Sequence, residues 1–247
     1  MQNQNIIIKW FFIVLSAGLF LTCSDSTSPD DALSDENFEF VLYDNLTSDQ
    51  IEDIAEQLDE NFQRIINDLR VQNMPRITIR IWADYEHFLQ DMDRDIGMRY
   101  TCATGYIFGM TEFRIYYNSQ VALAAVHEFA HMVSMQVNSS ISNNPRWLWE
   151  AVALYESNDF INPGTLPYMV SGDYPTLSEL NTDYNSSNHQ IYSVGYVLLE
   201  YIIQNWGMDE VIDLIKTNGN LQSVLGISVS EFEYGWYRFI EEKYLDN

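Results

Sequence analysis

Apolar residues recur at two distinct spacings in the first half of this chain. Between Ser48 and Arg70 they return every three or four positions, with charged residues on the opposite face. This spacing predicts an amphipathic helix that packs on a sheet. After Pro75, the segment from Arg76 to Trp82 alternates apolar and polar residues and predicts a strand.

The next predicted elements are a short helix and a pair of strands. Asp84 is a favourable N-cap, so a helix is expected to follow it to about Asp95. His87 lies in that helix near acidic residues, which favours a surface position over metal binding. Between Gly97 and Asn118, two apolar runs separated by a turn predict two strands.

The stretch from Val121 to Met135 is apolar on nearly every side and predicts a buried helix. Its ionisable residues are His127, Glu128 and His131. The two imidazoles lie one turn apart on the same face, so both can reach one tetrahedral metal ion. Glu128 lies about 100° further round the helix, within reach of a water molecule on such an ion.

A third metal ligand is expected from the following helix. Residues 138–144 have the composition of a loop, with Asn144 expected as the N-cap and Pro145 as the first helical residue. From Trp147 to Tyr155 the only acid is Glu150. An unpaired buried carboxylate is costly, and a metal ion would offset that cost. The alternative is that the two histidines are core residues that bind no metal.

These residues resemble the zinc site of the gluzincin peptidases. The motif His127-Glu128-x-x-His131 is followed, after eighteen intervening residues, by Glu150. The residues around this glutamate are similar to the Trp-Leu-x-Glu-Gly-x-Ala-x-Tyr phrase of peptidase MA-like domains, with Ala151 where a glycine is usual. A chance His-Glu-x-x-His match in a chain of this size is on the order of a one-in-a-hundred event.

The resemblance implies an α+β, thermolysin-like (zincin) domain. A small mixed sheet with an edge strand would lie over the His-Glu-x-x-His helix, followed by a mainly helical C-terminal part. The substrate-pairing edge is expected between Ala103 and Tyr117. Residues Tyr192 to Gly195 are similar to the Tyr-x-x-Gly of gluzincin aminopeptidases, which implies that Tyr192 donates to the oxyanion. His189 is the second choice for that role, and simple packing is the alternative role of Tyr192.

The implied activity is hydrolysis of a peptide or protein substrate with one Zn²⁺. His127, His131 and Glu150 would hold the ion, and Glu128 would act as general base on the activated water. The chain lacks the amine-anchoring Gly-x-Met-x-Asn phrase of aminopeptidases, which favours an endopeptidase. A gluzincin-fold binding lipoprotein without turnover and a non-peptide amide hydrolase are the alternatives.

The N-terminal residues predict export. Trp10 to Leu21 is an apolar run of twelve residues, too short to span a bilayer and typical of a signal peptide. Because the run ends near Cys23, residues 1–22 resemble a bacterial lipoprotein signal whose cysteine becomes lipidated. Ordinary secretion after cleavage near Ala17 is the alternative.

Residues 23–37 are polar and acidic and predict a disordered tether, which leaves 38–247 as one metallopeptidase domain. The expected location is the bacterial cell envelope, with a lipid on Cys23 at the periplasmic face or the cell surface. The net charge of −24 argues against nucleic acid as a partner, and a monomer is expected. Cys102 then has no disulfide partner and is expected to be a small buried thiol.

Two further predictions concern the C-terminal half. Residues 158–188, rich in proline and glycine, are expected to be irregular, either as a wall of the cleft or as a surface excursion. Helices are expected over 189–206, 209–216, 221–225 and 230–245.

Overall fold

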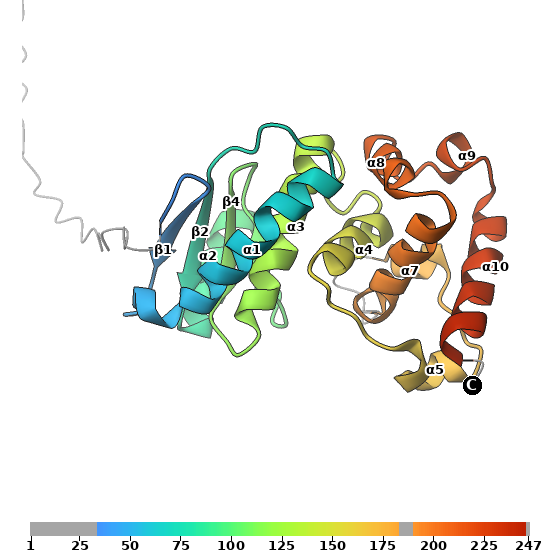
Figure 1. Cartoon of the computed structure of the whole chain (residues 1–247). Helices are drawn as coiled ribbons and strands as arrows, with labels where there is room; N and C mark the ends of the chain where they lie inside the picture. The colour runs from blue at the N-terminus through green and yellow to red at the C-terminus, as the bar shows by residue number, and fades with distance from the viewer. Residues whose placement is uncertain (1–33, 183–189, 246–247) are drawn as a thin grey trace, which may run out of the picture.

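Four strands form a small mixed sheet in the computed structural model, which describes residues 34–182 and 190–245 (Figure 1). They are β1 (Phe38–Leu42), β2 (Ile77–Trp82), β3 (Gly105–Ile107) and β4 (Glu112–Tyr116), in the spatial order β1-β2-β4-β3. The first three strands in this order run parallel, and β3 pairs antiparallel with β4. The short strand β3 is therefore an edge, within the range predicted for it.

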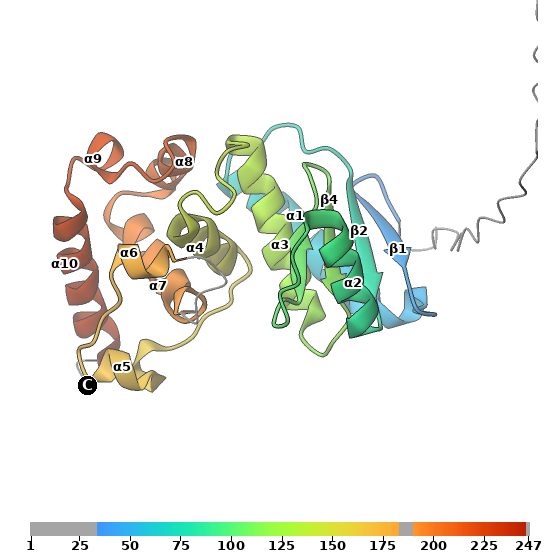
Figure 2. The ribbon, with the colours of Figure 1, turned by 180° about the vertical axis from the view of Figure 1, so that it is seen from behind.

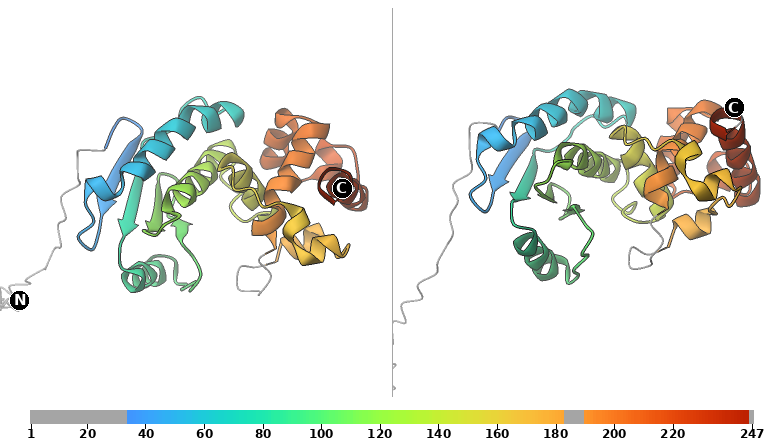
Figure 3. Two further views of the ribbon diagram at one scale, coloured as in Figure 1. Left: turned by 60° about the horizontal axis from the view of Figure 1, so that its bottom comes forward. Right: turned by 90° about the horizontal axis from the view of Figure 1, so that it is seen from below.

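Helices cover both faces of this sheet, as Figure 3 shows. The helices α1 (Glu52–Asp68) and α3 (Val121–Val137) lie on one face, over the buried side chains of Ile77, Ile79 and Ile81. The helix α2 (Tyr85–Ile96) covers the other face, where Trp82 and Phe88 belong to a second, smaller cluster (Figure 2). The predicted amphipathic helix and the predicted strand are thus confirmed, and a 3₁₀ turn (Ser48–Gln50) precedes α1.

The start of α2 is as predicted. The side chain of Asp84 accepts a hydrogen bond of 2.9 Å from the backbone N–H of His87 and caps the helix. The imidazole of His87 is 42% exposed, and its Nδ1 lies 2.7 Å from a carboxylate oxygen of Asp44. His87 is therefore partly exposed at the surface, as predicted, and its carboxylate neighbours are Asp44 and Asp91.

The start of α4 (Arg146–Glu156) lies one residue later than predicted. Pro145 has extended backbone angles and occupies the N-cap position, while the side chain of Asn144 donates to the carbonyl of Ser140 within the loop. The first backbone N–H of the helix is satisfied from a distant segment, since Arg146 N donates to Oδ1 of Asn181 over 2.7 Å. The cap prediction failed because this partner is remote in sequence.

The C-terminal part is mainly helical. Its longer helices are α7 (Ile191–Asn205), α8 (Met208–Lys216) and α10 (Val229–Ile240), with α9 (Leu221–Val224) between the last two and a π-helical turn (Glu241–Leu245) after them. Between α4 and α7, the described residues form only a 3₁₀ turn (Pro163–Thr165) and the short helices α5 (Pro167–Val170) and α6 (Leu177–Leu180). The α+β class, the small sheet and the helical C-terminal part therefore agree with the prediction.

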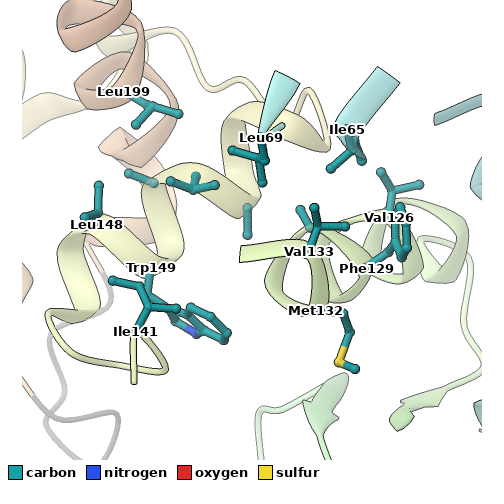
Figure 4. Close-up of a cluster of buried hydrophobic side chains, with 14 of the residues drawn as sticks. Ile65, Leu69, Val126, Phe129, Met132, Val133, Ile141, Leu148, Trp149 and Leu199 are labelled. Carbon is teal, nitrogen blue, oxygen red and sulfur yellow. The ribbon is translucent and has the colours of Figure 1, made fainter. Parts of the chain in front are cut away.

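One hydrophobic core joins the two parts. Figure 4 shows Ile65 of α1 and Phe129 of α3 in the same cluster as Trp149 of α4 and Leu199 of α7. Helices α3 and α4 meet at the centre of the molecule (Figure 1). Residues of the sheet half and of the helical half therefore belong to one buried cluster. The candidate ligands lie on these two central helices.

The N-terminal predictions fall mostly outside the described residues, which begin at Ser34. Residues 34–37, counted with the tether in the prediction, form a turn in which Oδ1 of Asp35 accepts from the backbone N–H groups of Asn37 and Phe38. Over the described ranges, no helix has both the length and the apolar character that a membrane span needs. The predicted signal peptide and Cys23 lie outside those ranges.

Candidate metal centre

Two imidazoles of α3 and one carboxylate of α4 converge. His127 Nε2 lies 3.3 Å from Glu150 Oε2, and His131 Nε2 lies 3.5 Å from the same oxygen. The potential ligand atoms of the three residues are all within 4.8 Å of one another. Two nitrogens and one oxygen form a donor set that zinc prefers, so the group is compatible with a metal ion.

The fold explains why these side chains meet. Helix α3 is buried along most of its length, so the spacing of four residues places both histidines on the face that meets α4. Glu150 is 5% exposed although it is a carboxylate, and the surrounding residues of α4 are apolar and buried. The two histidines are its nearest cationic or metal-binding partners, which accounts for a charge at this depth.

Helix α7 completes the centre because it packs closely on α4. A Cβ atom at Gly195 would lie 2.6 Å from a methyl group of Leu154 and 3.2 Å from the Cα of Ala151. The small residues at these two positions let the helices approach, and one turn earlier Tyr192 reaches the centre. Ala151, in place of the usual glycine, is fully buried in this contact and leaves the approach intact.

The second oxygen of Glu150 has partners of its own. Tyr192 Oη donates to Oε1 over 3.2 Å, and Nε of Arg146 lies 3.9 Å from the same oxygen. Arg146 also donates to the carbonyl of Thr182 over 2.7 Å, and its guanidinium lies over the Tyr192 ring. Oε2 therefore faces the histidines, while Tyr192 and Arg146 contact Oε1. Metal-binding carboxylates commonly have such outer partners, which fix their orientation.

Arg146 was missed by the sequence reasoning. It stands four residues before Glu150, which places both side chains on one face of α4. That i,i+4 spacing is the signal in the sequence that could have placed Arg146 beside Glu150.

An aromatic ring fixes the second histidine. The imidazole of His131 stacks on Trp149 with ring centroids 3.9 Å apart and planes tilted by 10°. Its Nδ1 is buried and has no hydrogen-bond partner within the described ranges, while its Nε2 points to Glu150. Burial lowers the pKa of His131 to about 4, so this imidazole is neutral at physiological pH and available as a ligand.

The two carboxylates of the centre, Glu128 and Glu150, differ in pKa. It raises the pKa of Glu128 to about 7, because His127 offsets the burial only in part and Glu150 adds to it. Burial acts on Glu150 in the same direction, but hydrogen bonds from His127 and His131 outweigh it and hold the pKa of Glu150 below its usual range. Burial lowers the pKa of His127, and the hydrogen bond and charge of Glu150 reverse this into a net rise. Glu150 is thus the charged carboxylate, and Glu128 is poised to exchange a proton.

The centre opens into a cavity of about 860 Å³ between the sheet and the helical part. The sheet part contributes lining residues that include Ile96, Ile107 of β3 and Leu123. The helical part contributes lining residues that include Asn181 and Thr182. The described part of the segment 158–188 therefore contributes a wall of the cavity, the first of the two alternatives considered for it.

The remaining predicted residues have mixed outcomes. Tyr192 lines the cavity and contacts Glu150, whereas His189 lies outside the described residues. Cys102 was expected to be buried and is exposed instead, because it lies in the turn before β3 rather than inside a strand. That prediction is wrong, and the thiol lines the cavity.

Comparison with known proteins does not assign this chain to a family. No protein-family model matches this chain, and no curated protein matches it.

Proposed function

We propose that this protein is a zinc-dependent peptidase of the gluzincin type, with a thermolysin-like (zincin) catalytic domain. The observation that carries the proposal is the convergence of His127, His131 and Glu150 beside a half-buried Glu128 in one cavity. The edge strand β3 on the same cavity supports a peptide substrate, since an unpaired strand edge can bind an extended main chain.

Each protein group then has a distinct task. His127 Nε2, His131 Nε2 and Glu150 Oε2 would hold one zinc ion, which supplies a Lewis acid and lowers the pKa of a bound water to about 7. Glu128 takes the proton of the attacking water at its carboxylate and later delivers it to the leaving amine nitrogen. Tyr192 Oη donates to the carbonyl oxygen of the substrate as negative charge develops there.

The raised pKa of Glu128 suits this task. A carboxylate with a pKa of about 7 is a stronger base than an exposed glutamate, and its acid form is a competent donor near neutral pH. Glu150 keeps its charge under the same burial because both histidines stabilise it. The two carboxylates therefore take different roles, base and ligand.

The proposed location is the cell envelope, with the domain attached through a lipid on Cys23 and acting as a monomer. The substrate would then be a peptide or protein outside the cytoplasm. The mixed apolar and polar lining of the cavity favours a peptide over a nucleic acid, as does the net charge of −24.

The decisive experiment compares the purified chain with its Glu128→Gln variant. Metal analysis is expected to find one zinc per chain in both, and a mixed peptide library is expected to be cleaved by the wild type alone. Zinc without cleavage in either protein would favour a binding lipoprotein, and cleavage of non-peptide amides alone would favour the amide hydrolase. Absence of zinc from both would reject the proposal.

A further inference from the structure

Position 105 departs from the pattern of the inward face of the sheet. The strand register pairs Gly105 with Ile115 and Ile107 with Phe113, so the two positions of β3 point to the face covered by α3. The partners Ile115 and Phe113 are large and fully buried. A glycine inside a strand weakens it and calls for a reason, such as the close approach of another group.

That group is the side chain of Glu128. A Cβ atom at position 105 would lie 2.5 Å from Oε1 of Glu128 and 3.0 Å from both its Cδ and its Cγ. Its three nearest neighbours would all belong to this one side chain. Gly105 is not among the glycines with positive φ, so the requirement for glycine is one of space and not of backbone conformation.

The same residue lies on the free edge of the sheet. Thr104 O accepts from Tyr116 N, and Phe108 N donates to Glu112 O, so the even-numbered residues of this strand pair with β4. In an antiparallel ladder the alternate residues turn their peptide groups the other way, which directs those of Gly105 and Ile107 outward. Both residues line the cavity. The carboxylate of Glu128 therefore rests against the part of the edge that a peptide substrate would occupy.

We infer that Gly105 is a positioning residue that seats the carboxylate of Glu128 against the edge strand. The missing side chain leaves a recess on the inward face of β3, and the glutamate fills it from α3. The recess fixes the position of the Glu128 carboxylate relative to a main chain paired with β3. The kinetic consequence of this position rests on the proposed function, whereas the steric coupling of Gly105 and Glu128 does not.

A cycle of stability measurements on the metal-free, full chain tests the coupling. Gly105→Ala is expected to lower the unfolding midpoint when Glu128 is present, because the new methyl group must displace the carboxylate. In the Glu128→Ala background the same change is expected to leave the midpoint unchanged or to raise it, since alanine restricts the unfolded chain. Gly164→Ala, whose Cβ would meet Asn162 and Tyr244 instead, serves as a control with equal effects in both backgrounds. Equal shifts of the unfolding midpoint for Gly105→Ala in the two backgrounds would show that Gly105 and Glu128 are not sterically coupled, and would overturn the inference.

Kinetics test the positioning role. Gly105→Ala is expected to lower kcat on the order of 100-fold while KM and zinc content stay unchanged, because a misplaced base affects the chemical step alone. A wild-type kcat would overturn the positioning role. If the effects of Gly105→Ala and Glu128→Ala on the unfolding midpoint are non-additive in a protein that binds no zinc and cleaves no peptide, the steric coupling is retained and the proposed function is rejected. The two failures are therefore distinguishable.

Discussion

The hydroxyl group of Tyr192 donates to Oε1 of Glu150, while both imidazoles face Oε2 of the same carboxylate. The tyrosine is thus close enough to hold the ligand and also borders the cavity where a substrate carbonyl would lie. These two roles predict different consequences when the hydroxyl group is removed.

Tyr192→Phe is expected to lower kcat on the order of 100-fold, the usual cost of removing one oxyanion donor. Zinc content is expected to stay at one per chain, since Arg146 still lies beside the carboxylate. Steady-state kinetics and metal analysis of the same preparation check both statements. Tyr196→Phe is the matched control, because this tyrosine lies one turn later on α7 and packs against Tyr155 and Phe160. An unchanged kcat in Tyr192→Phe would leave the tyrosine with its packing role only.

Glu150 is predicted to link metal binding to stability. Zinc at about 100 times its dissociation constant is expected to stabilise the folded wild type by about 2.7 kcal/mol, and a chelator is expected to remove that gain. Glu150→Ala is expected to lose most of this response, because one of three ligands is gone. Thermal unfolding with and without zinc measures it, with the exposed Glu52→Ala as control. A full zinc response in Glu150→Ala would place the metal elsewhere.

Helix spacing made the candidate metal centre predictable from the sequence. Residues four apart on α3 share a face, and the lone acid in the apolar part of α4 meets them because that helix packs alongside. Tyr192 followed from a short phrase, whose glycine turned out to allow the close contact between α7 and α4.

Features that depend on strand register or on remote contacts were not predictable. The recess at Gly105 exists only because β3 pairs with β4 in one register and α3 crosses beneath it. Arg146 is positioned beside Glu150 by its contacts with Thr182 and Tyr192, which are distant in sequence. Cys102 was misplaced because apolar character was taken to imply burial, although a turn before an edge strand is exposed.

Cys23 is predicted to decide where the protein is found. The wild-type chain, expressed in a bacterial host, is expected to fractionate with membranes and to incorporate a labelled fatty acid. Cys23→Ser is expected to do neither, whereas Cys102→Ser keeps both properties and controls for loss of a thiol. A soluble wild-type protein without label would favour secretion after cleavage near Ala17.

Glu156 is predicted to make stability depend on pH. It is the last residue of α4 and is 0% exposed. Its Oε2 lies 2.5 Å from Nη1 of Arg64 on α1. Nη2 of the same arginine donates to the backbone carbonyl of Glu156. Burial raises the pKa of Glu156 from 4.5 to about 7, since Arg64 offsets it only in part and Asp68 opposes that offset.

Between these two values the folded chain binds more protons at this residue than the unfolded chain does. The free energy of unfolding therefore falls as pH rises from about 4.5 to about 7, by up to roughly 3 kcal/mol, and this residue adds no further slope outside that window. Glu156→Gln keeps a polar partner for Arg64 but cannot ionise, so its stability should fall less steeply over the same range. Urea unfolding at several pH values, performed on metal-free protein, gives the difference between the two curves. Glu56→Gln, on the exposed face of α1, should follow the wild type, and a Glu156→Gln curve that did the same would show that Arg64 fully compensates the buried charge.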